Sequence, residues 1–99
     1  MYVARFSYTF APIHRKRALE FLREEKAAAE KMGLTARVLV PLTRGRDGAA
    51  LQFEVELDEL NQFDDFRHKK KSEAAIEGLD DILLTPPMIK LFHLASDDA

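Results

Sequence analysis

Three short segments of this sequence alternate in polarity, and they carry charged side chains: two segments contain an arginine and the third contains two glutamates. Glu54 and Glu56 alternate with apolar residues, and Arg5 and Arg37 occupy alternating positions in two other segments. Side chains at every second position of a strand share one face of a sheet. We therefore expect these four residues to meet on one polar face, with Ser7 beside Arg5.

This polar face allows two interpretations. In the first, Arg5, Arg37 and Glu54 form ion pairs that fix the register of a dimer, because a charge buried without a partner is costly. In the second, Arg5, Ser7 and Arg37 hold a small anionic or enolic ligand, and Glu54 is a catalytic residue that accepts its proton. The sequence leaves both open.

Three further residues offer other chemistry. An imidazole is the natural proton shuttle near neutral pH, which makes His93 a second catalytic candidate, although a hydrogen-bonded core role also fits. Tyr8 carries a phenol that either orients a ligand or packs against helices. His14 opens a basic run at the start of a predicted helix, where free amide groups favour an anionic ligand. Neutralisation by Glu20 and by acidic residues of the other half of the chain is the alternative explanation of that run.

Several classes of site are not expected. The three His residues are scattered and the chain has no Cys, so we predict no metal site. The sequence contains no phosphate-binding, dinucleotide-binding or nucleophile-elbow motif, and we predict no cofactor. With a net charge of −2, nucleic acid is not the expected partner.

Length and composition indicate one globular domain over residues 1–99, since 46% of the residues are apolar and 32% are charged. A chain of this length buries a limited core, which favours stabilisation by a second subunit. No apolar run is long enough for a membrane span and no signal-peptide pattern is present, so we expect a cytoplasmic protein without a membrane partner.

Charge is unevenly distributed along the chain. Residues 1–46 carry ten Lys or Arg and four Asp or Glu, whereas residues 47–99 carry five and thirteen. We expect the two halves to interleave in space and to attract each other.

The hydrophobic patterns predict an alternation of strands and helices. Residues with period two indicate strands, and the Ala-, Leu- and Glu-rich stretch between Pro12 and Gly33 indicates a helix. The predicted elements are a strand over 2–10, a helix over 12–32, an edge strand over 34–42, a turn over 44–48, a strand over 51–57, a helix from 58 that is broken near residues 71–72 and ends before 86, and a strand over 88–95.

This order of elements predicts an α+β, ferredoxin-like β-α-β-β-α-β fold. Right-handed connections give an antiparallel sheet of order 4-1-3-2 with both helices on one face. The other face is left bare and invites a second copy. An RNA-binding sheet of this topology is disfavoured, because the third strand would present Gln52, Glu54 and Glu56 to the phosphates.

Three segments resemble a known family: residues 5–8, residues 53–60 with Phe63 and Phe66, and residues 83–91. They resemble the dimeric α/β-barrel superfamily, and within it the NIPSNAP and antibiotic-biosynthesis-monooxygenase type of small domain. The resemblance implies a homodimer whose two sheets enclose a cavity, used in some members for cofactor-free oxidation of aromatic compounds or for haem breakdown.

The haem-degrading and quinone-forming branches of that superfamily use an Asn, Trp and His set. This chain has no Trp and its one Asn is Asn61, so those two activities are not carried over. The resulting prediction is a small-molecule-binding dimer, either a cofactor-independent oxygenase or an isomerase-like enzyme on an aromatic or enolisable substrate. The alternative is a non-catalytic dimeric binding or stress-type module.

Overall fold

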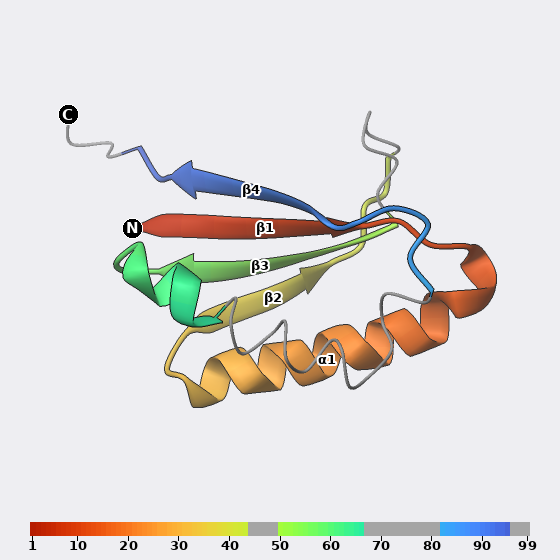
Figure 1. Ribbon diagram of the computed structural model, residues 1–99, viewed down its shortest axis with the longest axis horizontal. Helices are drawn as coiled ribbons and strands as arrows, with labels where there is room; N and C mark the ends of the chain where they lie inside the picture. The colour runs from red at the N-terminus through yellow and green to blue at the C-terminus, as the bar shows by residue number, and fades with distance from the viewer. Residues whose placement is uncertain (44–49, 67–81, 96–99) are drawn as a thin grey trace.

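A computed structural model describes residues 1–43, 50–66 and 82–95. The alternating segments form one antiparallel sheet of order β2-β3-β1-β4, which is the predicted order read from the other edge, and α1 lies along one face of the sheet (Figure 1). The predicted α+β ferredoxin-like fold is therefore confirmed. The elements are β1 (Tyr2–Tyr8), a 3-10 turn η1 (Pro12–His14), α1 (Arg15–Lys31), β2 (Thr35–Leu39), β3 (Leu51–Leu57) and β4 (Met88–His93).

Besides β4, which ends at His93 and not at residue 95, two strands are shorter than the alternation predicts. β1 ends at Tyr8, and Phe10 keeps only an isolated bridge to Leu83. β2 ends at Leu39, two residues before Pro41, which has no N–H to donate to a neighbouring strand. Alternating polarity extends past a strand end whenever the flanking residues happen to continue it, so the pattern overestimates both lengths.

The helix α1 begins and ends with local signals in the sequence. Pro12 occupies the first position of η1, where a missing N–H costs nothing. Gly33 follows the helix with a φ of 81°, and the Leu34 N–H donates to the Ala29 carbonyl at 3.0 Å. This left-handed residue and backward hydrogen bond are typical of a glycine-terminated helix.

A second helical segment covers residues 61–66. The Gln62 Oε1 atom accepts hydrogen bonds from the backbone N–H groups of Asp58 and Glu59, at 2.8 and 3.1 Å, and so satisfies donors at the start of the helix. The predicted break near residues 71–72, the turn over 44–48 and the last residues 96–99 lie outside the described part of the chain.

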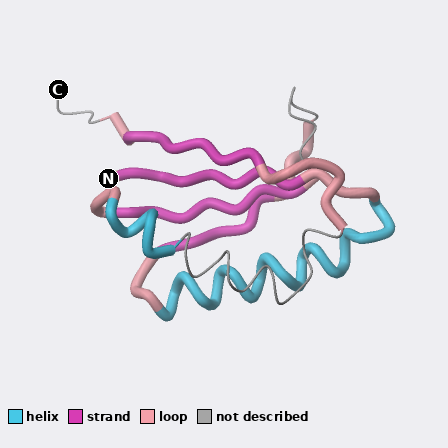
Figure 2. The backbone as a smooth tube through the Cα atoms, viewed as in Figure 1, coloured by secondary structure: helices cyan, strands magenta, loops and turns pink. Residues whose placement is uncertain are grey.

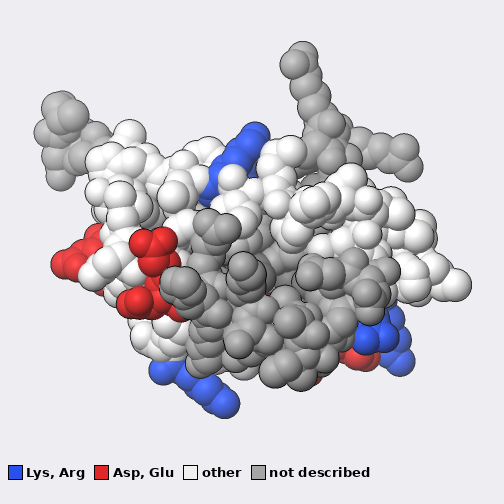
Figure 3. Space-filling model, viewed as in Figure 1, with Lys and Arg blue, Asp and Glu red and all other residues white. Residues whose placement is uncertain are grey.

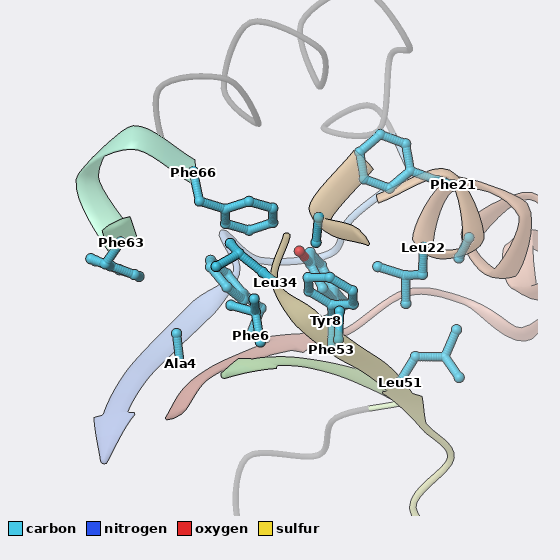
Figure 4. Packing of buried hydrophobic residues seen from close by; sticks show 14 of the residues in the cluster. Ala4, Phe6, Tyr8, Phe21, Leu22, Leu34, Leu51, Phe53, Phe63 and Phe66 are labelled. Carbon is cyan, nitrogen blue, oxygen red and sulfur yellow. The ribbon is translucent and has the colours of Figure 1, made fainter. Parts of the chain in front are cut away.

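The hydrophobic core lies between the sheet and the helical segments (Figure 4). Its centre is a group of four aromatic rings: the Phe6 centroid lies 6.0–6.3 Å from those of Phe53, Phe63 and Phe66, and the centroids of Phe53 and Phe66 are 6.0 Å apart. Ala18, Leu22 and Ala29 pack onto this layer from one stripe of α1, because residues three, four and seven positions apart share a helix face. This packing fixes which side of every strand faces the helices.

The edge strand β4 is the least covered part of the sheet. In Figure 2, α1 lies next to β2, while β4 forms the opposite edge. All six residues of β4 are exposed, including the apolar side chains on both of its faces. Among the described residues, no helix is long and apolar enough to cross a membrane.

Candidate functional site

The strand registers place twelve side chains on the sheet face that points away from the aromatic core, here called the open face. Residues paired directly across antiparallel strands share a face, so the twelve form three ranks across the sheet. The first rank is Thr35, Glu56, Val3 and Phe92; the middle rank is Arg37, Glu54, Arg5 and Lys90; the third rank is Leu39, Gln52, Ser7 and Met88.

Four charged residues of the open face form an ion-pair network: Arg5, Arg37, Glu54 and Glu56. Arg5 Nε donates to Glu54 Oε2 at 2.6 Å, and Arg37 Nε donates to Glu54 Oε1 at 2.9 Å. Arg37 NH1 also donates to Glu56 Oε1 at 3.1 Å. The neighbours predicted from the alternation are confirmed, and residues from the two halves of the chain attract each other as expected.

Burial is concentrated on the central carboxylate of this network. Glu54 is 4% exposed, although none of the described helices lies on its face of the sheet, because the two guanidinium groups cover it. Both of its oxygens accept N–H donors from arginines of the same protomer. Hydrogen bonds from Arg37 to Glu56 and then to Glu54 raise the pKa of Arg37 above its ordinary value, even though partial desolvation lowers it. The geometry fits the ion-pair interpretation better than a general base.

The β4 side of the open face holds cations with spare donors. The Arg5 guanidinium carbon lies 5.0 Å from the centroid of the Phe92 ring, a cation–π distance. Within the described chain, Arg5 NH1 and NH2 donate no hydrogen bond, and Lys90, directly opposite Arg5 on β4, forms no ion pair. The Ser7 hydroxyl is not part of this group, since it accepts a hydrogen bond from Gln52 at 3.2 Å.

His93 lies on the other face of the sheet. It pairs with Tyr2, whose face packs on the core, and the two rings are 5.0 Å apart. Glu54 lies on the open face, so the sheet itself separates the two residues predicted to be catalytic. The four residues predicted as polar contacts of a small-molecule site, Arg5, Arg37, Glu54 and His93, therefore do not lie on one face of a protomer. Each side of β4 carries one polar residue among apolar ones, so its sequence alone does not show which side joins Arg5.

The two remaining candidates lie away from the open face. Tyr8 is 1% exposed and belongs to the core beneath α1 (Figure 4), where a ligand would reach it only from between the sheet and the helices. His14 is half-buried at the start of α1, whose first turn contains no acidic residue. The ligand-binding roles of both residues stay predictions.

Sequence reasoning missed three residues. Lys90 and Phe92 belong to the open face, which only the pairing of β4 with β1 reveals. Glu25 is 2% exposed on the buried stripe of α1, between Leu22 and Ala29. The spacing did carry a signal for Glu25, because positions 18, 22, 25 and 29 follow the helical period and three of them are apolar.

Elsewhere in the molecule, the described residues form a pocket but no group of metal ligands. A hollow of about 310 Å³ precedes β4, lined by the uncharged residues 83–87, and no predicted site residue contributes to it. In the described part of the chain, no group of three or more His, Asp or Glu side chains is arranged to hold a metal ion.

Exposed acidic residues gather around the segment 61–66. Figure 3 shows red acidic atoms near the segment 61–66, where Asp58, Glu59, Asp64 and Asp65 are exposed. Blue basic atoms appear in this view toward the two ends of α1 and at the upper edge, and red atoms adjoin the blue ones at the right.

No protein-family model matches the chain, and no curated protein matches it. Two solved structures are similar to it over nearly all of its length. The crystal structure of an antibiotic biosynthesis monooxygenase has a TM-score of 0.77 at 12% identity, covering 97% of this chain and 100% of that chain. Rv0793 from Mycobacterium tuberculosis has a TM-score of 0.73 at 13% identity, with 100% of both chains covered. The predicted antibiotic-biosynthesis-monooxygenase type of fold is confirmed; identities this low show the fold alone.

Proposed function

We propose that this protein is a homodimer whose open faces pack against each other, and that the ion-pair network specifies this contact. The main support is the state of Glu54, which is 4% exposed and contacted by two arginines on a face that no described helix of the chain covers. A carboxylate neutralised in this way can be covered further by a second subunit without being left as an unpaired buried charge.

The apolar residues around the network support the same contact. Met88 and Phe92 are 46% and 38% exposed at one side of the open face, and Leu39 lies at the other side. Burying such side chains contributes roughly 25 cal/mol per Å². The network then supplies register, and the apolar rim supplies most of the favourable free energy.

Sedimentation velocity over a range of concentrations tests the dimer. We expect a particle of twice the protomer mass at micromolar concentration, with dissociation promoted by high salt because half-exposed ion pairs are screened. Amide hydrogen exchange adds a local readout, since β1 and β3 should be protected in the dimer. A single protomer at all concentrations would refute this function.

A second candidate function, small-molecule binding, is supported by the helix face of β4. Ile89 and Leu91 are 37% and 47% exposed there, next to the Tyr2 and His93 rings. A small aromatic or enolisable compound would lie on the aliphatic side chains, with the imidazole of His93 receiving its proton. The name of the similar monooxygenase suggests oxidation as the reaction class, and we expect the reaction to need no cofactor.

Titration with a hydroxynaphthoic acid, followed by amide NMR shifts, separates the possible sites because the two faces carry different residues. Shifts at Tyr2 and His93 would support the helix face of β4, and shifts at Arg5 and Arg37 would assign the ligand to the open face. Oxygen uptake with a dihydroxynaphthalene then tests for oxidation. No shift and no uptake would favour the non-catalytic dimeric module.

A further inference from the structure

We propose that the two-fold axis of this dimer runs parallel to the strands and passes between β1 and β3 at the level of Arg5 and Glu54. Each Arg5 then contacts Glu54 of the second copy as well as Glu54 of its own chain. This inference rests on the proposed dimer and adds the arrangement of its interface.

Few arrangements are possible for two identical sheets that pack face to face. Such sheets lie about 10 Å apart, and in the aligned class their strands cross at roughly 30°. The two-fold axis must lie midway between the sheets, and it runs either nearly along the strands or nearly across them. These two cases place different residues opposite each other.

An axis along the strands reverses the order of the strands, so that the β2 edge of one sheet faces the β4 edge of the other. Each rank stays opposite the same rank of the second copy. β1 then faces β3 of the second copy, so Arg5 lies opposite Glu54 in two symmetry-related pairs. β4 faces β2, which brings the apolar Met88 opposite Leu39.

An axis across the strands keeps each strand opposite its own copy and exchanges the first and third ranks. Every residue of the middle rank then faces itself, so Arg5 meets Arg5, Glu54 meets Glu54, and Arg37 and Lys90 do the same. Like charges directly opposite each other are destabilising, most of all at the buried centre of an interface.

Charge complementarity therefore favours the axis along the strands. Its unfavourable pair, Arg37 opposite Lys90, lies at the two rims, where water screens the charges and Glu56 already contacts Arg37. The central contact is insensitive to the crossing angle, because residues close to the axis move little when the sheets rotate about their common normal.

Arg5 and Glu54, next to the proposed axis, can each form further hydrogen bonds. Arg5 engages Glu54 of its own chain through Nε, and within the described residues NH1 and NH2 remain open as donors. A carboxylate offers about four acceptor positions, so Glu54 can accept further N–H groups from a second Arg5. Four charges of alternating sign then close into one cluster around the axis.

Cysteine cross-linking distinguishes the two axes, because the chain has no native Cys. Leu39→Cys and Met88→Cys proteins are mixed, allowed to exchange subunits and treated with a short bis-maleimide. We expect covalent dimers to form about tenfold faster than from a matched mixture of Met88→Cys and Phe92→Cys, since facing thiols have a high effective concentration. Sedimentation of each variant alone verifies that it remains a dimer.

Each outcome has one meaning. Faster linking of positions 39 and 88 supports the axis along the strands. Faster linking of positions 88 and 92, or equal rates for dimeric proteins, overturns it while leaving the proposed dimer intact. An unmodified protein that sediments as a single protomer refutes the dimer itself, and this inference with it.

Discussion

Glu54 and His93 lie on opposite faces of the same four-stranded sheet. Glu54 pairs with Arg5 on the open face, whereas His93 pairs with Tyr2 on the face that carries the core. Within one protomer the two residues do not share a site. Substitutions at the two positions should therefore change different properties of the protein, and this separation underlies the first two predictions.

Replacing Glu54 by Ala should dissociate the proposed dimer. The change leaves Arg5 without its carboxylate partner and Arg37 with Glu56 alone, so packing two open faces together would bury unneutralised cations. We expect loss of dimer at micromolar concentration by sedimentation velocity. The free energy of unfolding of the protomer should fall by about 1 to 3 kcal/mol.

Glu56→Ala is the matched control for that change. Glu56 accepts one hydrogen bond from Arg37 and is more exposed than Glu54, so its loss should leave the dimer largely intact. A Glu54→Ala protein that stays fully dimeric would show that the network does not specify assembly.

Replacing His93 by Ala should spare the dimer and remove binding at the helix face. His93 is exposed, so the free energy of unfolding should change by no more than about 0.5 kcal/mol. The NMR shifts induced by hydroxynaphthoic acid at Tyr2 should disappear. Lys90→Ala, on the same strand but the other face, is the control, and equal losses in both variants would count against a site at His93.

The faces of β1 and β3 could be predicted from the sequence because polar and apolar residues alternate there. That alternation alone assigns Arg5 and Glu54 to one side of the sheet. The face of His93 could not be predicted. β4 has Met88, Lys90 and Phe92 on one side and Ile89, Leu91 and His93 on the other, so each side carries one polar and two apolar residues and the pattern fits either orientation. Only the pairing of β4 with β1 shows that His93 lies on the core face.

The buried acid of α1 illustrates a different limit. Helical spacing places Glu25 on the stripe that packs on the sheet, yet a carboxylate at such a position is usually assigned to the surface. Periodicity gives the direction of a side chain, while its burial depends on what covers that direction. Periodicity also does not fix where a strand ends. The alternation continues beyond Leu39, but the chain leaves the sheet there, before Pro41.

Phe66→Ala should be among the most destabilising single changes in the core. The Phe66 ring is 1% exposed, and its centroid lies 6.0 Å from that of Phe53 and 6.1 Å from that of Phe6. Loss of the ring leaves a cavity that costs about 3 to 5 kcal/mol. Urea unfolding followed by circular dichroism measures it, and Leu60→Ala, at a residue that is 49% exposed, should change stability far less.

Gly33→Ala tests backbone conformation without a steric effect. A Cβ at this position would meet no atom within 4 Å, but the φ of 81° is unfavourable for a residue with a side chain. We expect a loss of about 1 to 2 kcal/mol in thermal or urea unfolding. Gly33→Asn should lose less, because Asn tolerates this region better. Equal losses for Ala and Asn would contradict this explanation.

Arg37→Lys should make the dimer sensitive to alkaline pH. The pKa of Arg37 is raised by its hydrogen bonds to Glu56 and Glu54, so the stability that it contributes is fully present below the unfolded pKa and is lost only at still higher pH. Lys titrates near pH 10.4 when unperturbed and cannot donate as a planar fork to two carboxylates. We therefore expect the variant dimer to weaken between about pH 9 and 11 while the unmodified dimer persists. All other titratable groups are the same in both proteins, so the difference between the two sedimentation profiles isolates position 37. Superimposable profiles would show that Arg37 does not contribute to the stability of the interface.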